Sequence, residues 1–506
     1  MMATRLGGHL RPFWKTLAFS LAVLAQVAPA HAQGAPPVVP PPTAPAAPAP
    51  AVKGPSTDSL QQAALGAPPA SHATLAPGDI EPPKEEDGGP AVPPPQDLPQ
   101  RLSLDDALKI FRARGFGLLI ADANIASARG DEKIAGAVPN PALNIGYGRV
   151  LGSGVSCAGG DCLDQYTIGI SDQAGIEDSL SGKRNLRLKV AHAALAAAKL
   201  NRVDAQRTLE FQVKSAYFQT VQTQKAYDFA KDTQADSAEA LRINQDRLTA
   251  GKINEGDFER LHSVTLEADQ AVDAAFQALR QAKVALAFLM GVRGRVPDFD
   301  VDKDALKFPD PALQPFVAAT TDGLVRKAYD QRPDLLAYGY QAERANASIA
   351  LAKRQVFPDI TASIQYTQTG TGVGAVQPPT IGIGFSAPIP VVYRMQGDIL
   401  KAQADLTTQQ LSRAQTAAQI ASDVETAYAA YLGARTLVER MEGPLLKSSK
   451  IALDKTKLQY QQGKANLTDY LDARRDWIST NVEYIQDLTN YWTAVAQLEE
   501  AVGQKR

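Results

Sequence analysis

The sequence predicts an α+β protein in which long helical hairpins alternate with pairs of short strands, in two consecutive halves. A proline-free tract at 182–250 would form one helix of about 100 Å, at roughly 1.5 Å per residue. Four short segments alternate apolar with small or polar residues, which is typical of strands. The motif "GKINEGDF" at Gly251 returns as "GKANLTDY" at Gly463, and the glycines that close the two halves, Gly291 and Gly503, keep the same register.

Residues 1–32 have the pattern of a secretory signal peptide. Arg5, Arg11 and Lys15 precede the apolar run "TLAFSLAVLAQVA", and small residues favour cleavage after Ala32. After this segment, no uninterrupted apolar run approaches the roughly 18 residues that a membrane-spanning helix needs. We therefore expect the exported protein either to be soluble outside the inner membrane or to cross a membrane as β-strands.

A proline-rich segment, 33–100, follows. Since proline fixes φ and lacks a backbone donor, we expect an extended, disordered linker there. Farther along, Cys157 and Cys162 lie in the glycine-rich stretch "SGVSCAGGDCLD". In an oxidising compartment, cysteines this close predict a small disulfide ring. A metal site is the alternative, with a weak ligand set because no histidine is adjacent.

The alternating segments form two predicted β-hairpins, at about 141–175 and 358–391. Each strand is about as long as a tilted strand that crosses a bilayer. Soluble hairpins packed on helices would show the same alternation. Four strands cannot close a barrel, and an open sheet edge is not viable in lipid. Strands that span a membrane would therefore require several chains to contribute to one barrel.

Each predicted β-hairpin is followed by a long helical tract, a glycine turn and a returning helix. The turns lie at Gly251 and Gly463, and the second tract should kink or break at Gly443 and Pro444. Apolar residues spaced by three and four along the returning helices predict coiled-coil seams. The expected organisation is a first repeat at 101–295, a connecting segment at 296–320 and a second repeat at 321–503.

Charge and motifs give no support for nucleic acid binding or catalysis. The net charge is −2, and nucleic acid binding would need a basic stripe. The sequence has no phosphate-binding loop, nucleophile elbow or complete dinucleotide-binding motif. After the linker only two histidines remain, His192 and His262, without acidic or cysteine companions at ligand spacing. We expect no enzyme activity, no cofactor and no metal site.

Several segments resemble the TolC family of bacterial outer membrane efflux proteins. They include "LSLDDALKIF", "SGKRNLRLKVAHAAL", "PIPVVYRMQGDILKAQADL" and "GKANLTDYLDARRDW", and the similarity covers about 103–503. The metal-exporting, CzcC-like branch is the most similar. The family implies a homotrimer in outer membrane lipid, with a 12-stranded transmembrane β-barrel, four strands per chain, continuous with a long periplasmic α-helical coiled-coil barrel. It also implies a passive exit duct that binds a periplasmic adaptor protein and an inner membrane pump of the RND type.

The resemblance implies that the two turns form the periplasmic aperture of the duct. Family members carry constricting acidic rings, which here fall on Asp469 and Asp472; six carboxylates around a narrow pore favour cations. Asp469 could equally serve the N-terminus of its helix, as could Asp257. The implied adaptor contacts are Gly251, Lys252, Gly463 and Lys464.

The family also latches its closed state by hydrogen bonds between the two turns. Tyr460 and Asp257 match such a pair. Two further latch positions carry Gly256 and Ala465, in place of a threonine and an arginine. Part of the family latch is therefore missing.

Other protein classes fit parts of the sequence. The outer membrane duct of a type I protein secretion system would share this architecture. A soluble periplasmic coiled-coil adaptor would carry one helical hairpin flanked by small β-domains, and a secreted toxin would lack the repeat in register. The residues do not specify whether the substrate is a metal ion, a drug or a polypeptide.

Overall fold

A computed structural model describes residues 98–151, 164–173, 175–310, 316, 318–370 and 378–503. All of them belong to one compact unit, Pro83–Arg506. The expected signal peptide, most of the proline-rich segment and both cysteines, Cys157 and Cys162, lie outside the described residues.

The two halves contain their elements in the same order. The first half comprises β1 (Arg101–Leu102), α2 (Leu104–Arg114), α3 (Phe116–Gly136), β2 (Ala142–Arg149), β3 (Asp164–Ser171), α4 (Gly175–Ser181), α5 (Lys183–Thr249) and α6 (Glu255–Leu289). The connecting segment contains β4 (Asp300–Val301) and the short helix η1 (Lys303–Leu306). The second half comprises α7 (Thr321–Gln331), α8 (Pro333–Arg354), β5 (Thr361–Thr369), β6 (Thr380–Ser386), α9 (Gln396–Arg440), η3 (Met441–Leu445), α10 (Leu446–Gln461) and α11 (Leu467–Val502). In both, helices precede two strands and a long helical hairpin follows.

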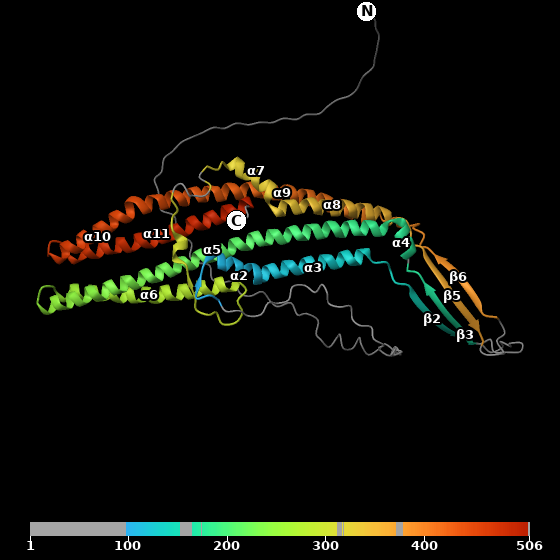
Figure 1. Ribbon diagram of the computed structural model, residues 1–506, viewed down its shortest axis with the longest axis horizontal. Helices are drawn as coiled ribbons and strands as arrows, with labels where there is room; N and C mark the ends of the chain where they lie inside the picture. Colours follow the sequence, from blue (N-terminus) through green and yellow to red (C-terminus); the bar gives the residue numbers. More distant parts are fainter. Residues whose placement is uncertain are drawn as a thin grey trace, which may run out of the picture. The chain divides into compact units, whose positions relative to one another are not determined.

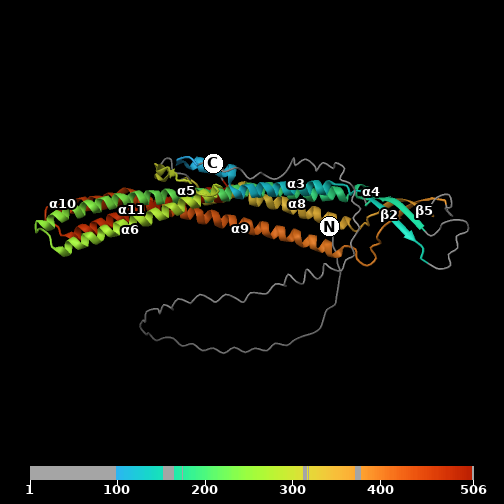
Figure 2. The same ribbon diagram turned by 90° about the horizontal axis from the view of Figure 1, so that it is seen from below.

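The long helix α5 is the central element of the described unit. It runs for 67 residues, which confirms the single helix expected over 182–250, and it starts after Gly182 at φ +77°. It packs against α3, α6, α8 and α11, so it contacts helices of both halves (Figures 1 and 2). Among the described helices, none combines the length and the apolarity that crossing a membrane requires.

The corresponding helix of the second half is divided. Between α9 and α10, residues Met441–Leu445 form a π-helical turn. Pro444 lies inside it and has no N–H for the regular i→i−4 bond, so the helix widens locally. The break expected at Gly443 and Pro444 is confirmed, and it distinguishes this hairpin from the one that α5 builds without interruption.

The strands form one antiparallel sheet in the order β2-β3-β5-β6. Each predicted hairpin pairs internally, and β3 pairs with β5 to join the two halves. The sheet lies at one end of the long helices, and both glycine turns lie at the other end (Figure 1). Within the described sheet, β2 and β6 are edge strands.

One face of this sheet is apolar and uncovered. Cross-strand pairing aligns Ile145, Ile168, Tyr366 and Ile381 in one row. The two isoleucines at its ends are 74% and 76% exposed. A second exposed row contains Leu143, Ile170, Ile364 and Ile383. The predicted alternation is therefore confirmed, and no helix in the described part of the chain covers the apolar face.

Each half has its own hydrophobic core near the middle of the helices. The first surrounds Phe111, Tyr217 and Leu286. The second surrounds Tyr431 and Tyr491, whose ring centroids lie 5.9 Å apart. The segment expected only to connect the halves contributes to this region, because β4 pairs in parallel with β1.

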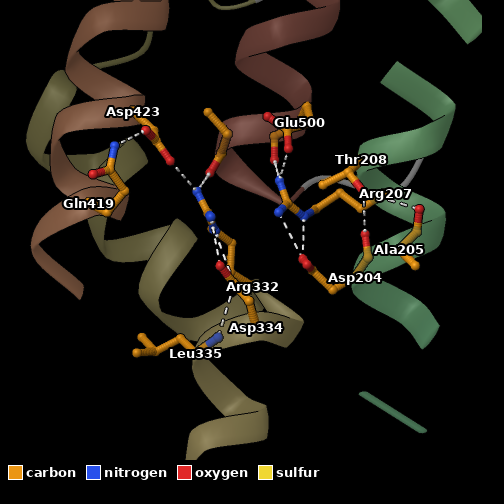
Figure 3. A network of polar contacts seen from close by, with 11 residues as sticks. Asp204, Ala205, Arg207, Thr208, Arg332, Asp334, Leu335, Gln419, Asp423 and Glu500 are labelled. Carbon is orange, nitrogen blue, oxygen red and sulfur yellow. Dashed lines mark hydrogen bonds and ion pairs between the residues drawn. The ribbon is translucent and has the colours of Figure 1, made fainter. Parts of the chain in front are cut away.

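Two arginines link helices beside the C-terminal end of α11 (Figure 3): Arg332 links helices of the second half, and Arg207 joins the first half to the second. Arg332, 6% exposed, donates to Asp334 of α8 at 3.1 and 2.7 Å and to Asp423 of α9 at 3.1 Å. Arg207 of α5 donates to a carboxylate within its own helix and also to the carboxylate of Glu500 in α11. Charge-assisted bonds therefore link α5, α8, α9 and α11 at one level.

The two acids of this network respond to pH in opposite directions. Burial raises the pKa of Asp334, but the bonds and charge of Arg332 outweigh burial and hold it below the ordinary value of 3.8. For Glu500 burial outweighs the attraction of Arg207, so its pKa is above 4.5. Stability from Asp334 is thus lost as pH falls through its lowered pKa, whereas stability from Glu500 is lost as pH rises through its raised pKa.

Replacing Arg332 should leave two partly buried carboxylates unpaired. We expect Arg332→Met to lower the free energy of unfolding by about 2 to 3 kcal/mol near pH 7, somewhat less than for a fully buried pair because Asp334 and Asp423 keep some contact with solvent. Melting of the purified protein at several pH values checks this. The decrease in the free energy of unfolding caused by Arg332→Met should become smaller at acidic pH, where Asp334 is protonated. The exposed Arg242→Met is the control and should change little; an equal effect of both variants would contradict the assignment.

Candidate functional site

The two glycine turns are the candidate site, and they are built in the same way. In the first, Gly251 has φ +65° and its amide donates to Leu248 O at 2.9 Å. The amide of Lys252 donates to Arg247 O at 2.8 Å. This pair of bonds is a Schellman cap, in which a residue at positive φ satisfies the last carbonyls of a helix.

The second turn repeats this geometry. Gly463 has φ +72°, and its amide donates to Tyr460 O at 3.0 Å. The amide of Lys464 donates to Gln459 O at 2.8 Å. Since glycine adopts positive φ without the cost that a Cβ brings, the helix ends require both glycines of the repeated motif.

The repeated asparagine and aspartate cap the returning helices. Asn254 Oδ1 accepts from the amide of Asp257 at 2.7 Å, and Asn466 Oδ1 accepts from the amide of Asp469 at the same distance. Asp469 also accepts from the amide of Asn466 at 3.3 Å, which completes a capping box. Asp469 therefore has the capping role that the sequence left open, whereas the Asp257 carboxylate accepts from the side chain of Asn254.

Asp472 has no such local role. It lies one turn after Asp469 on α11, its side chain is 60% exposed, and its nearest cation is Arg475 at 3.5 Å. An ion pair this exposed contributes little to stability. Asp472 is thus the acid of the second turn whose presence the helix cap does not explain.

Tyr460 connects the second hairpin to the first. Its hydroxyl donates to Asn244 Oδ1 at 2.8 Å, and its ring stacks on Tyr470 with centroids 5.4 Å apart. Arg247 lies over the same ring at 5.3 Å and donates to Gln461 O at 3.2 Å. Burial raises the pKa of Tyr460, so the hydroxyl stays protonated and can donate at neutral pH.

This geometry differs from the pair that the family resemblance implies. Within one chain, Tyr460 bonds to Asn244 of α5, and the carboxylate of Asp257 accepts instead from Asn254 Nδ2 at 2.9 Å. Asn244 is 2% exposed. The sequence offered one clue to it, an asparagine in the last turns of a long helix, where this residue is otherwise unfavourable.

Arg474 is a second connection that the sequence analysis missed. It is 6% exposed, and its Nη2 donates to the carbonyl of Thr233 at 3.0 Å and to the hydroxyl of Ser237, both on α5. No carboxylate among the described residues forms an ion pair with it. Leu261, Leu453 and other apolar side chains pack around the same level. A buried guanidinium that bonds only neutral acceptors fixes α11 against α5 through geometry rather than charge pairing.

Each of the two histidines has an acidic neighbour in the structure, and His262 Nδ1 lies 3.6 Å from Glu259 Oε2 on its own helix. His192 Nδ1 lies 2.8 Å from Glu132 Oε1 of α3, an acidic neighbour that is distant in sequence. Within the described ranges, no three His, Cys, Asp or Glu side chains come together as metal ligands.

A double-mutant cycle tests the observed contact between the hairpins. We expect Tyr460→Phe and Asn244→Ala to show a coupling of about 1 kcal/mol in the free energy of unfolding, because each change alone removes the same hydrogen bond. The matched pair, Tyr460→Phe with Asp257→Ala, should be additive. Coupling in the second pair without coupling in the first would favour the family-type latch instead.

The chain is similar in sequence to a known protein family and to several of its members. The family model "Outer membrane efflux protein" matches residues 108–292 and 324–504. The cobalt-zinc-cadmium resistance protein CzcC of Cupriavidus metallidurans is 22% identical over 434 residues, which span 83% of this chain and 95% of the relative. The pyoverdine export outer membrane protein OpmQ of Pseudomonas aeruginosa is also 22% identical, over 79% of this chain and 83% of the relative.

Solved structures share the fold. The chain superposes on CusC with a TM-score of 0.65 at 18% identity, covering 82% of this chain and 98% of that one. It matches the outer membrane protein VceC of Vibrio cholerae with a TM-score of 0.61 at 19% identity, covering 79% and 96%. The chain therefore belongs to the outer membrane efflux protein family: it is an efflux channel of the bacterial outer membrane with a large periplasmic part, and not an enzyme.

Proposed function

We propose that three copies of this chain form the exit duct of a tripartite efflux system. The observation that carries the proposal is the sheet, with its exposed apolar rows and its edges at β2 and β6. If β2 of each chain pairs with β6 of the next, three chains give a closed 12-stranded barrel whose apolar face meets lipid. Closure in this way satisfies every edge N–H and C=O, as a bilayer requires.

The helical hairpins form the periplasmic part of the proposed duct. The halves 101–295 and 321–503 act as an internal repeat, so three chains would contribute six hairpins to one α-helical barrel. The glycine at positive φ and the asparagine N-cap that the two turns share support this equivalence. The turns would then form the aperture at the end of the duct that lies farthest from the membrane.

The proposed partners are a periplasmic adaptor protein and an inner membrane pump. Gly251, Lys252, Gly463 and Lys464 are exposed at the turns and are available for adaptor contact. We assign the pump to the RND type because of the resemblance to metal-exporting channels. The duct itself is passive, and the pump supplies the energy.

The proposed substrates are metal ions, drugs or other small molecules. The names of the relatives span cobalt, zinc and cadmium resistance, pyoverdine export and solvent efflux. A similar chain therefore serves chemically different cargo, which supports a conduit whose specificity lies mainly in its pump. Metal ions are the first choice, since the CzcC match covers the greatest share of this chain among the relatives compared above.

Deleting the gene in its native cell tests the efflux function. We expect heat-modifiable trimers in the outer membrane of the parent strain, and greater sensitivity to divalent metals or small toxic compounds in the deletion strain. Re-expression should restore resistance. Loss of a secreted polypeptide with unchanged resistance would favour a type I secretion duct, and recovery of the chain in the soluble periplasm would favour an adaptor.

The second turn should set the ion selectivity of the proposed aperture. Asp469→Asn with Asp472→Asn removes six carboxylates from a trimeric ring, so single channels in planar bilayers should lose most of their cation preference, read as a reversal potential closer to zero in a salt gradient. Asp257→Asn, which changes the equivalent cap of the first turn, is the matched control. Unchanged selectivity in the double variant would remove these aspartates from the aperture.

A further inference from the structure

An open groove of about 670 Å³ lies beside the helical hairpin of the first half, in the size range of ligand sites. Helices α5 and α6 form its walls, and the segment that leads into β4 forms one rim. It is separate from the turns, because no residue of either turn lines it.

Two aromatic side chains give the groove an apolar wall. Tyr227 of α5 and Phe276 of α6 have ring centroids 5.7 Å apart, and Phe276 is 40% exposed. Val284 lines the same groove and is 51% exposed. Uncovered aromatic grooves of this kind bind proline-rich segments, which are already extended and lose little entropy on binding.

A residue that lines the groove, Gln224, has a buried side-chain acceptor without a donor. Gln224 is 6% exposed, and its Oε1 has no hydrogen-bond partner among the described residues, although its Nε2 donates to Asp228 at 3.4 Å. Buried polar atoms in native proteins are nearly always paired.

The groove also carries unpaired positive charge. Lys283 is paired with Asp298 at 2.9 Å and with Asp300 at 3.5 Å. Arg280 and Arg295 line the groove, are exposed, and form no ion pair with the described residues. An acidic occupant is therefore favoured.

The described chain begins at this groove. The amide of Asp300, a lining residue, donates to Gln100 O at 2.8 Å, and Leu98 packs on the adjacent core. Immediately before it, residues 84–97 read "KEEDGGPAVPPPQD", with three consecutive acids followed by four prolines. Fully extended, this stretch reaches roughly 40 Å at about 3.1 Å per residue, enough to follow the groove.

We propose that residues 84–97 of the chain bind in this groove. The prolines pack on Tyr227 and Phe276, and the acids pair with Arg280 and Arg295. Residues 84–97 are thereby held against α5 and α6. This inference does not rest on the proposed transport function.

Site-specific photo-crosslinking tests the occupant. A benzophenone side chain at Val284, in the full mature chain in lipid nanodiscs, should crosslink to a peptide within 84–97. The same group at Leu411, an exposed position of α9 that does not line the groove, should not. A crosslink from Val284 to another segment, to a second protein or to nothing would overturn the proposal.

Charge exchange tests the recognition. Arg280→Glu with Arg295→Glu should reduce the crosslink yield at least fivefold, and adding Glu85→Lys, Glu86→Lys and Asp87→Lys should restore it. Because these side chains are either exposed or outside the described residues, the substitutions should not disturb folding. An unchanged melting temperature checks this. If the exchange fails to restore the crosslink, the charge pairing is wrong. Because no transport is measured, a failure of efflux would leave this result unaffected.

Discussion

The unpaired backbone groups at the two edges of the described sheet are the constraint on which the proposed assembly depends. Among the described residues, β2 and β6 each pair on one side only, and the rows that cross the sheet expose isoleucine, leucine and tyrosine. In water the apolar face would forgo about 25 cal/mol for each Å² left exposed. In lipid the apolar face has no such cost, but each unpaired backbone N–H or C=O at a sheet edge costs several kcal/mol. The proposed pairing with other chains within a membrane would remove both costs, and it would place the axis of the duct outside the single chain.

The helices must keep a fixed alignment over a long distance for such an assembly to close. Two separate cores and the arginine network at Arg332 and Arg207 provide this alignment near the middle, where four long helices of both halves meet. At the turns, the contacts of Tyr460 and Arg474 hold the second hairpin to α5. The π-helical turn lies between these two levels and only in the second hairpin. The two hairpins therefore share their caps but differ in the helix behind them.

Local features of this fold were predictable from the sequence. The glycine and asparagine of each repeated motif act within a few residues of themselves, so the turn that they build follows from Gly251 and Gly463 alone. The alternation of strands and the break at Pro444 are local in the same sense.

The contacts between the hairpins were not predictable. Asn244 meets Tyr460, and Arg474 meets Thr233, only because two hairpins more than 200 residues apart in sequence pair in one particular register. Neither periodicity nor composition specifies that register. The bond from Tyr460 to Asn244 depends on how the helices rotate against one another, and the family resemblance did not indicate it. The contact of His192 with Glu132 was not predictable either, because it too depends on how two helices pack against each other.

The most direct test of the account is to determine the stoichiometry and strand pairing of the mature protein in lipid nanodiscs by electron cryomicroscopy. The account predicts three chains around one closed barrel, with β2 of each chain hydrogen-bonded to β6 of its neighbour and all six turns at the opposite end. A single chain whose sheet edges remain open in lipid, or an assembly in which the apolar rows face protein instead of lipid, would contradict it.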